Sequence, residues 1–218
     1  MKANEAFDNV CALISEKYKE GGWIYSKSSH WMTKKDKKFM YKVFFYTSWN
    51  NVSDKNVVFY GECAIIPLKS KNKIFHTNTR KCNVPSGRLH WNIANEEAWD
   101  QTVNEFTSWL DSVFVPIVDS CMNDLDNFVK QVVLEGFYPP DGYIIDIEFV
   151  LANGSLELAE EATKRYYASL SESIKKEFKE NYERMINGNE AVSAYGHNMM
   201  RNYSNFRTII ENNIRVAL

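Results

Sequence analysis

Several features that define common protein classes are missing from this sequence. The four cysteines form no CxxC pair, and the start of the chain lacks the apolar segment of a secretion signal, so we expect reduced thiols in a cytoplasmic protein. No run approaches the roughly 18 consecutive apolar residues of a membrane-spanning helix, so we expect no membrane partner. The nine glycines form neither GxxxxGK[ST] nor GxGxxG, which excludes the common phosphate-binding loops.

The composition is that of a folded chain rich in aromatic residues. Of the 218 residues, 44% are hydrophobic and 25% are charged. These proportions are close to the average for globular proteins, which excludes a disordered chain and a fibre. Aromatic residues make up 14%, and their large apolar rings favour sheets and interfaces. The length allows one or two domains with a sizeable core.

The first part of the chain has the pattern of a helix followed by a strand meander. Apolar residues recur at helical spacing between residues 4 and 20, and Gly21-Gly22 ends the pattern as a C-cap does. Residues 23–68 contain long runs of β-branched and aromatic residues, joined by short polar turns at 34–37 and 50–54. This alternation of runs and turns predicts antiparallel hairpins.

Both faces of the second long strand are expected to be apolar. An antiparallel sheet with one solvated face usually alternates cleanly between apolar and polar residues, whereas both faces here carry rings. We therefore expect helices on both sides of the sheet, or a partner on one side. One predicted face has Phe39, Tyr41, Val43, Phe45 and Trp49, and the other has Met40, Lys42, Phe44, Tyr46 and Ser48.

The remainder of the chain is predicted to be mostly helical. Residues 69–87 have the composition of a basic polar loop, and a short strand at 88–93 should return to the sheet. Helical periodicity follows from Asn95, with a break or restart at Pro116. Residues 143–151 fit a strand or a helix, and we favour a helix because an Ala-rich helix follows directly.

These patterns predict an α+β fold: an antiparallel sheet of four or five strands packed by helices, with a helical C-terminal segment. The Pro-containing connector at 138–142 is the best candidate for a boundary. We therefore expect an α+β core with the antiparallel sheet over residues 1–136. Residues 137–218 are expected to form a helical segment that packs on this core.

Charge is distributed unevenly along the chain. Residues 1–94 contain 16 Lys and Arg against 7 Asp and Glu, whereas residues 95–218 contain 10 against 21. The asymmetry suggests an anionic partner for the basic half. Ordinary solvated turns and helix surfaces also explain it. Lysine dominates arginine in the basic half, which weakens the case for nucleic acid, because recognition of phosphates and bases usually draws on arginine.

No set of residues has the spacing of a metal site or of a nucleophile with its base. His76, Cys82 and His90 could converge but form no HxxxH or CxxC pattern, so we predict no metal and no cofactor. Cys82 is the only thiol predicted to be exposed, and it has no evident base. The other cysteines lie in apolar periodic segments and are expected to be buried: Cys11, Cys63 and Cys121.

Glu62 is an isolated carboxylate in an apolar strand. We expect a basic partner such as Arg88 or Lys42, because an unpaired carboxylate is costly to bury. We favour a structural ion pair over a catalytic role, and we predict no catalytic residue. If the protein is an enzyme of an unrecognised type, the candidates that the sequence offers are His90, Glu62 and Arg88.

The order of the predicted segments is distinctive. A helix ending at Gly22-Trp23 is followed by a strand meander, and then by a loop with Cys82 before a tryptophan-ended strand at 88–91. A helix ending at 113–116 and an Ala-rich helical hairpin at 151–159 complete the order. This order resembles an uncharacterised bacterial family that is defined only as a domain of unknown function. Some of its members lie in toxin–immunity or defence loci, so the resemblance implies protein binding; it supplies no catalytic residues.

We therefore predict a non-enzymatic cytoplasmic protein of the immunity or defence type that binds another protein. Negative charge on such a protein would steer association with a basic partner. The alternatives are a nucleic-acid-associated protein that uses the basic loops 34–38 and 69–81, and an enzyme of an unrecognised type. The sequence leaves self-association open. The candidate binding residues are Asp100, Glu157 and Glu161 for a basic protein, and Trp31, Lys35, Lys71, Arg80 and Lys81 for nucleic acid.

Overall fold

The computed structural model divides into two compact units. By their contacts, the described residues up to Asp124 form the first unit and those from Leu125 form the second. The first unit contains the sheet, and the second is helical. The boundary predicted between residues 136 and 137 lies outside the described residues, and the packing of the C-terminal segment on the core stays a prediction. The structure describes residues 2–69, 73–79, 90–134, 145–188 and 203–216.

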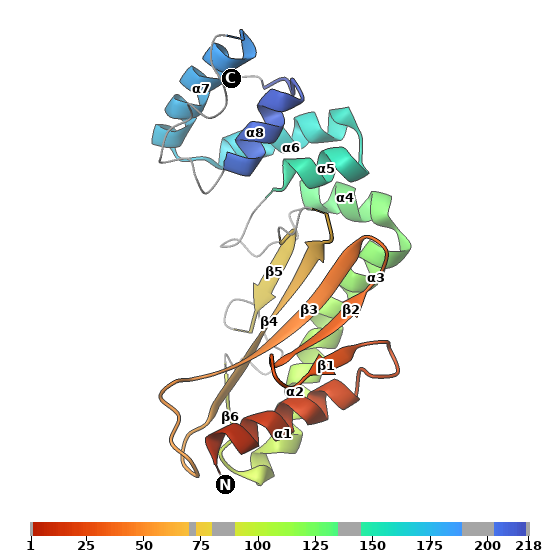
Figure 1. The fold of residues 1–218 in the computed structure, drawn as a ribbon, viewed down its shortest axis with the longest axis vertical. Coiled ribbons are helices and arrows are strands. Elements are labelled where there is room, and N and C mark those ends of the chain that lie inside the picture. The colour runs from red at the N-terminus through yellow and green to blue at the C-terminus, as the bar shows by residue number, and fades with distance from the viewer. Residues whose placement is uncertain (1, 70–72, 80–89, 135–144, 189–202, 217–218) are drawn as a thin grey trace. The chain divides into compact units, whose positions relative to one another are not determined.

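Among the described residues, the first unit contains a six-stranded antiparallel sheet (Figure 1). The first five strands lie side by side in sequence order, and β6 pairs with one end of β4. The central pairing, β3 with β4, is the longest and runs over nine residue pairs. The strands are β1 (Ile24–Ser26), β2 (Trp31–Lys35), β3 (Phe39–Thr47), β4 (Val58–Pro67), β5 (Phe75–Asn78) and β6 (Trp91–Asn92).

Three α-helices of the first unit accompany the sheet: α1 (Ala3–Glu16), α2 (Trp99–Trp109) and α3 (Val115–Asn123). Residues 96–98 form a short 3₁₀ turn before α2, and a turn of π-helix, Leu110–Phe114, joins α2 to α3. Pro116 therefore lies in the first turn of α3, directly after the π turn. The break or restart predicted at this proline takes the form of a change from π-helix to α-helix, and the backbone stays helical from α2 to α3.

One face of the sheet packs against these helices, and we call it the covered face. In β3, buried residues alternate with half-buried ones, so Tyr41, Val43 and Phe45 share this face. The Phe106 ring of α2 lies over it, with its centroid 5.9 Å from the Phe45 ring and 5.2 Å from the Phe59 ring. Phe106 is fully buried. The core of the first unit is therefore an aromatic layer between the sheet and the helices.

Gly61 of β4 makes this close approach of α2 feasible. A Cβ atom at this position would lie 2.5 Å from Cζ of Phe106 and 3.2 Å from the carbonyl oxygen of Phe44. A buried ring held on four sides by other rings has little room to move away. The absence of a side chain at Gly61 is therefore a packing requirement of the covered face.

The second unit has its own apolar core. Its centre includes the Phe178 and Phe206 rings, whose centroids are 5.1 Å apart, and both are fully buried. The helices are α4 (Leu125–Leu134), α5 (Ile147–Asn153), α6 (Leu156–Ser169), α7 (Glu172–Ile186) and α8 (Tyr203–Glu211). Asp146 caps the N-terminus of α5 and Ser155 caps that of α6, because each side chain accepts a hydrogen bond from a backbone N–H group.

The α+β fold predicted from the sequence is confirmed, and so is the helix at the ambiguous segment, which begins at Ile147. Three local predictions are wrong. The first helix ends at Glu16 with Lys17 as its C-cap, before the glycine cap predicted at Gly21-Gly22. The segment predicted as a loop over 69–87 contains strand β5. Trp49 does not extend the covered face, because β3 ends at Thr47 and the Trp49 side chain is 93% exposed. Within the described part of the chain, no helix is long and apolar enough to cross a membrane.

Candidate binding face of the sheet

The other face of the sheet, which we call the open face, carries a mixed set of aromatic and charged side chains. Residues opposite each other in register share a face, so the pairs Trp31–Phe44 and Tyr46–Tyr60 place four rings here. All four rings are half-buried. The open face comprises Trp31 and Lys35 of β2, Lys42, Phe44 and Tyr46 of β3, Tyr60 and Glu62 of β4, His76 of β5, and Lys73 just before β5.

The four rings form a continuous ladder across three strands. The Trp31 and Phe44 rings meet edge-on, with their centroids 5.8 Å apart. The centroids of the Phe44 and Tyr46 rings are 6.3 Å apart. Tyr46 stacks on Tyr60 across the strands, with centroids 5.3 Å apart and ring planes 20° apart. Each tyrosine therefore covers one face of the other. The ladder is an apolar surface whose rings already contact each other.

Two lysines lie among these rings, and a third, Lys35, is their neighbour on the same face. Lys42 Nζ is 3.8 Å from the centroid of the Trp31 ring and 5.5 Å from that of Phe44, and Lys73 Nζ is 5.4 Å from the Phe44 centroid. Lys35 is diagonal to Lys42 across the pairing of β2 with β3. Burial lowers the pKa of Lys42, and the charges of Lys35 and Lys73 lower it further. Within the described part of the chain, none of these ammonium groups pairs with a carboxylate.

Glu62 contributes a carboxylate to the open face. Its Oε2 atom lies 3.1 Å from Nε2 of His76. The hydrogen bond with His76 is the main cause that lowers the pKa of Glu62, and burial acts in the opposite direction. The charges of His76 and Lys73, and a hydrogen bond from Tyr46, lower this pKa further. Burial and the neighbouring carboxylate raise the pKa of Tyr46. Glu62 is therefore ionised at neutral pH, and its carboxylate interacts with His76 and Tyr46.

The partner of Glu62 differs from the sequence-based expectation. Lys42 lies over a ring instead, and Arg88 lies outside the described residues. Because Ala64 is opposite His76 in the pairing of β4 with β5, the imidazole lies diagonal to the carboxylate. The expectation is wrong for Lys42 and untested for Arg88, and it missed His76 because it treated the segment that contains this residue as a loop, which has no register with β4.

The first unit separates its charges between its two sides. Residues 95–124, which form two of the three helices on the covered face, α2 and α3, include seven Asp and Glu and no Lys or Arg. The open face carries three lysines and one carboxylate that is already paired. Such an arrangement attracts an anionic partner to the open face and repels it from the helical side. The charge asymmetry noted in the sequence is therefore also an asymmetry within one unit.

Only part of the predicted nucleic-acid set falls on this face. Trp31 and Lys35 lie together on it, as neighbours on one side of β2. The sequence-based candidates did not include Phe44, Tyr60 or the pairing of Glu62 with His76. The alternation of β4 was a usable signal for Tyr60, whereas nothing in the sequence indicated the partner of Glu62. Three further candidates lie outside the described residues: Lys71, Arg80 and Lys81.

The predicted acidic set does not form one described surface. Asp100 lies in α2 of the first unit, whereas Glu157 and Glu161 lie in α6 of the second. Glu161 also forms ion pairs with Lys164 at 3.8 Å and with Arg165 at 3.2 Å, one helical turn away. Its negative charge is therefore partly compensated on its own helix.

The cysteines support no metal or catalytic site among the described residues. Cys11, Cys63 and Cys121 are buried, as expected. Burial raises the pKa of the Cys121 thiol to about 12 and that of Cys11 still further. The predicted exposure of Cys82 concerns a residue outside the described set. In the described ranges, no three His, Cys, Asp or Glu side chains lie close enough to hold a metal ion.

A second polar cluster lies where α1 meets the turn between β1 and β2. Nε2 of His30 is 3.0 Å from Asp8, and the Lys27 ammonium is 3.2 Å from the same carboxylate. His30 has a φ of 51°, which is unusual for a residue other than glycine. Asp8 and His30 line a pocket of about 450 Å³ that is also lined by Tyr46. The carboxylate is already shared by the Lys27 ammonium and the His30 imidazole, so this cluster is self-contained.

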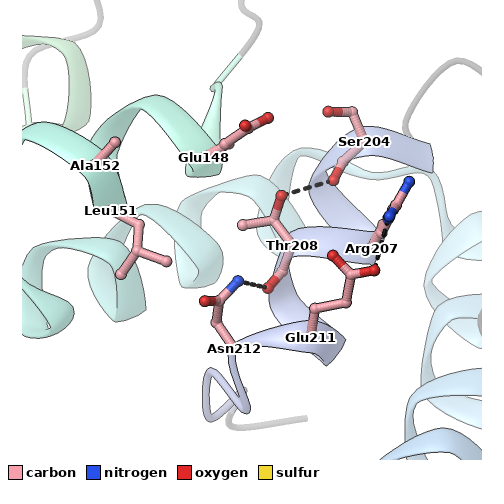
Figure 2. Close-up of a pocket in the computed structure, with 8 residues that line it drawn as sticks. All are labelled: Glu148, Leu151, Ala152, Ser204, Arg207, Thr208, Glu211 and Asn212. Atoms are coloured by element: carbon pink, nitrogen blue, oxygen red, sulfur yellow. Dashed lines mark hydrogen bonds and ion pairs between the residues drawn. The ribbon is translucent and has the colours of Figure 1, made fainter. Parts of the chain in front are cut away.

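The second unit has a groove between α5 and α8 with a volume of about 590 Å³ (Figure 2). Figure 2 shows Arg207 bonded to Glu211 and Thr208 bonded to Ser204, all within α8; the Arg207–Glu211 distance is 2.7 Å. Glu148 projects from α5 on the opposite wall. The polar groups drawn there bond mainly along one helix, so they do not converge on a ligand.

Comparison with protein-family models, with curated proteins and with solved structures found no match for this chain. The fold and the open face by themselves define the class: an α+β protein whose antiparallel sheet carries aromatic and basic side chains on the face opposite α1, α2 and α3.

Proposed function

We propose that the protein is a cytoplasmic, non-enzymatic binding protein of the immunity or defence type, which recognises an acidic segment of another protein through its open face. The observation that carries the proposal is the group of three lysines that shares this face with four half-buried rings. Apolar rings supply contact area, and the lysines supply charge complementarity. The resemblance in segment order to a family found in toxin–immunity and defence loci supports the same class of function.

The geometry of the rings favours a protein over a nucleic acid. Bases bind sheet surfaces by stacking on free aromatic faces. Here Lys42 occupies one face of Trp31, and Tyr46 and Tyr60 cover each other. The open face as defined contains no arginine, the residue that phosphates and bases usually require. Side chains of a protein partner can instead pack between ring edges and pair with the lysines.

This surface differs from the acidic one that the sequence-based hypothesis assigned to a protein partner. Asp100, Glu157 and Glu161 were expected to meet a basic partner, but they lie in separate units and one of them is paired on its own helix. The proposed partner is therefore acidic at the contact. The acidic helices keep a role as an alternative surface, and the experiment below includes it as an outcome.

The test begins with a photo-reactive amino acid at position 44 of the full chain, followed by purification of the protein that it crosslinks. Binding of that protein is then measured for the wild type and for the triple variant Lys35→Glu, Lys42→Glu and Lys73→Glu. We expect the affinity to fall by at least about tenfold, because each reversal places like charges at the contact. The matched control reverses three exposed turn lysines, Lys37, Lys38 and Lys69, and should change the affinity by less than about threefold.

Equal loss in the two triple variants would contradict the proposal, since it would show a general charge effect. Loss of binding only when Asp100, Glu157 and Glu161 are changed to neutral amides would place the contact on the acidic helices.

Nucleic-acid binding is the second candidate, because the contacts of Lys42 and Lys73 with rings combine basic charge and aromatic surface on one sheet. Gel-shift titration with single-stranded and double-stranded DNA and RNA tests it. Micromolar binding at physiological salt that is lost in the open-face triple variant, but kept in the control, would favour nucleic acid over protein.

A further inference from the structure

Two of the three lysines on the open face share one ring, and the third lies beside them in the register of the sheet. The ammonium groups of Lys42 and Lys73 approach the same Phe44 ring, with Nζ 5.5 Å and 5.4 Å from its centroid. Lys42 lies in β3, and Lys73 lies two residues before the start of β5. Lys35 joins them from β2, diagonal to Lys42. The fold therefore brings three like charges to one side of one ring ladder.

No carboxylate among the described residues forms a direct ion pair with this lysine cluster, Lys35, Lys42 and Lys73, although the charge of Lys73 acts on Glu62. Glu62 is the carboxylate that shares the face, and its Oε2 atom is engaged by His76 at 3.1 Å. Keeping like charges close without a counter-ion costs free energy unless something else compensates it. The mutual effect of the charges is visible at Lys42, whose pKa they lower in addition to burial. The cluster is therefore suited to an anion supplied from outside.

The chemistry of the cluster selects among anions. A carboxylate brings one negative charge and two oxygens, which suits one or two cations. A phosphate monoester brings a charge of about −1.5 to −2 and three acceptor oxygens, which suits three ammonium groups that approach from different sides. Lysine binds phosphate as a point charge and needs no planar, two-pronged geometry. The Phe44 ring provides an apolar floor beneath the charges.

We propose that the lysine cluster is a subsite for a phosphate monoester carried by a phosphorylated serine, threonine or tyrosine of the partner protein. The proposal rests on the proposed function, since it names the chemical group that the open face recognises. The rings beside the cluster then contact the residues that flank the phosphorylated side chain. Phosphorylation of the partner would switch this contact on.

The experiment compares three peptides of one sequence, Gly-Glu-X-Glu-Gly, in which X is phosphoserine, glutamate or serine. Binding to the full chain is followed in ¹⁵N-labelled protein by the indole Nε1–H signal of Trp31, which is assigned with the variant Trp31→Phe. This ring contacts Lys42 at 3.8 Å, so it reports on the cluster. We expect the phosphoserine peptide to bind at least about tenfold more tightly than the glutamate peptide, because of its additional charge and oxygens.

Neutral variants assign the effect to the cluster. Lys42→Gln and Lys73→Gln should each weaken binding of the phosphoserine peptide by about threefold or more, whereas Lys38→Gln, an exposed turn lysine, should leave it within about 1.5-fold. Lys73 is exposed, so its variant is expected to fold even if Lys42→Gln does not. Inorganic phosphate at millimolar concentration should shift the same indole signal in the wild type.

The outcomes separate the two proposals. Equal affinities for the phosphoserine and glutamate peptides, both reduced in Lys73→Gln, would overturn the phosphate subsite and leave the proposed function standing. Absence of any shift with all three peptides and with inorganic phosphate would overturn the subsite, and the crosslinking experiment would then decide the function on its own. A single-stranded RNA of 12 nucleotides that binds more tightly than the phosphoserine peptide, through the same lysines, would overturn both.

Discussion

The two faces of the sheet carry similar aromatic side chains but differ in what those side chains contact. On the covered face, Phe45 and Phe59 are buried beneath Phe106 of α2. On the open face, Phe44 and Tyr46 lie on the same strand as Phe45, yet they contact other rings and lysines and stay half-buried. Successive residues of β3 therefore serve different purposes, because side chains alternate between the faces.

This difference shows how composition alone misleads. An apolar residue on the covered face is explained by burial, which contributes about 1.5–3 kcal/mol for each large side chain. A half-buried ring on the open face gains less from folding, and its exposed surface is available to a partner. The predictions below test whether the covered face supports stability while the open face supports binding.

Truncation of Phe106 should produce the largest loss of stability. Phe106→Ala removes a fully buried ring that contacts Phe45, Phe59 and Trp91, and we expect the free energy of unfolding to fall by about 3–5 kcal/mol. Phe44→Ala makes the same chemical change on the open face and should cost only about 1 kcal/mol. Urea denaturation measures both. Similar losses for the two variants would mean that the faces do not differ as described.

Thiol reactivity should show the same contrast in kinetics. Cys63 lies on the covered face and Cys121 in α3, and both are buried. At pH 8 we expect alkylation of both to be at least about 100-fold slower in the native protein than in denaturant, because access is blocked and the pKa of Cys121 is about 12. Cys82 is predicted to react fastest. Peptide mass spectrometry after timed quenching provides the rates; Cys63 reacting as fast as Cys82 would show that its burial is wrong.

A methyl group at Gly61 should destabilise the contact between the sheet and α2. Gly61→Ala places Cβ 2.5 Å from the Phe106 ring, and overpacking of this kind costs about 1–3 kcal/mol. The control is the same change in a Phe106→Leu background, where the distal ring atoms are absent. We expect the cost of Gly61→Ala to be smaller there. Additive losses in the double variant would show that the clash is with the backbone instead.

The Glu62–His76 pair should have the smallest effect on stability. Because the folded-state pKa of Glu62 is lowered, its contribution is complete above its ordinary pKa and is lost as the pH falls through the lower, folded-state value. Both side chains are partly exposed, so Glu62→Gln should cost at most about 1 kcal/mol at neutral pH. The variant should also lose stability less steeply in acid than the wild type, measured by thermal melts between about pH 3 and pH 6. The exposed Glu20→Gln serves as control; an equal change of slope there would contradict the assignment.

The sequence predicted the elements better than their partners. Helical spacing and hairpin turns identified most elements, since these signals are local. The two-sided apolar pattern of β3 correctly indicated that both faces carry rings, but it assigned Trp49 to the covered face because alternation does not show where a strand ends. The four residues of β5 were too few to distinguish from a loop. His76 as the partner of Glu62 depends on the register between β4 and β5, which is a long-range property of the fold.

The central claim is that the open face, and not an acidic helix, is the working surface of the protein. The most direct test is to measure the changes in backbone and indole chemical shifts when the partner identified by crosslinking is added. We predict that the largest shifts fall on Trp31, Lys42, Phe44, Tyr46 and His76, with little change in α2 or α6. Shifts concentrated around Asp100 in α2, or around Glu157 and Glu161 in α6, with the open face unperturbed, would contradict the account.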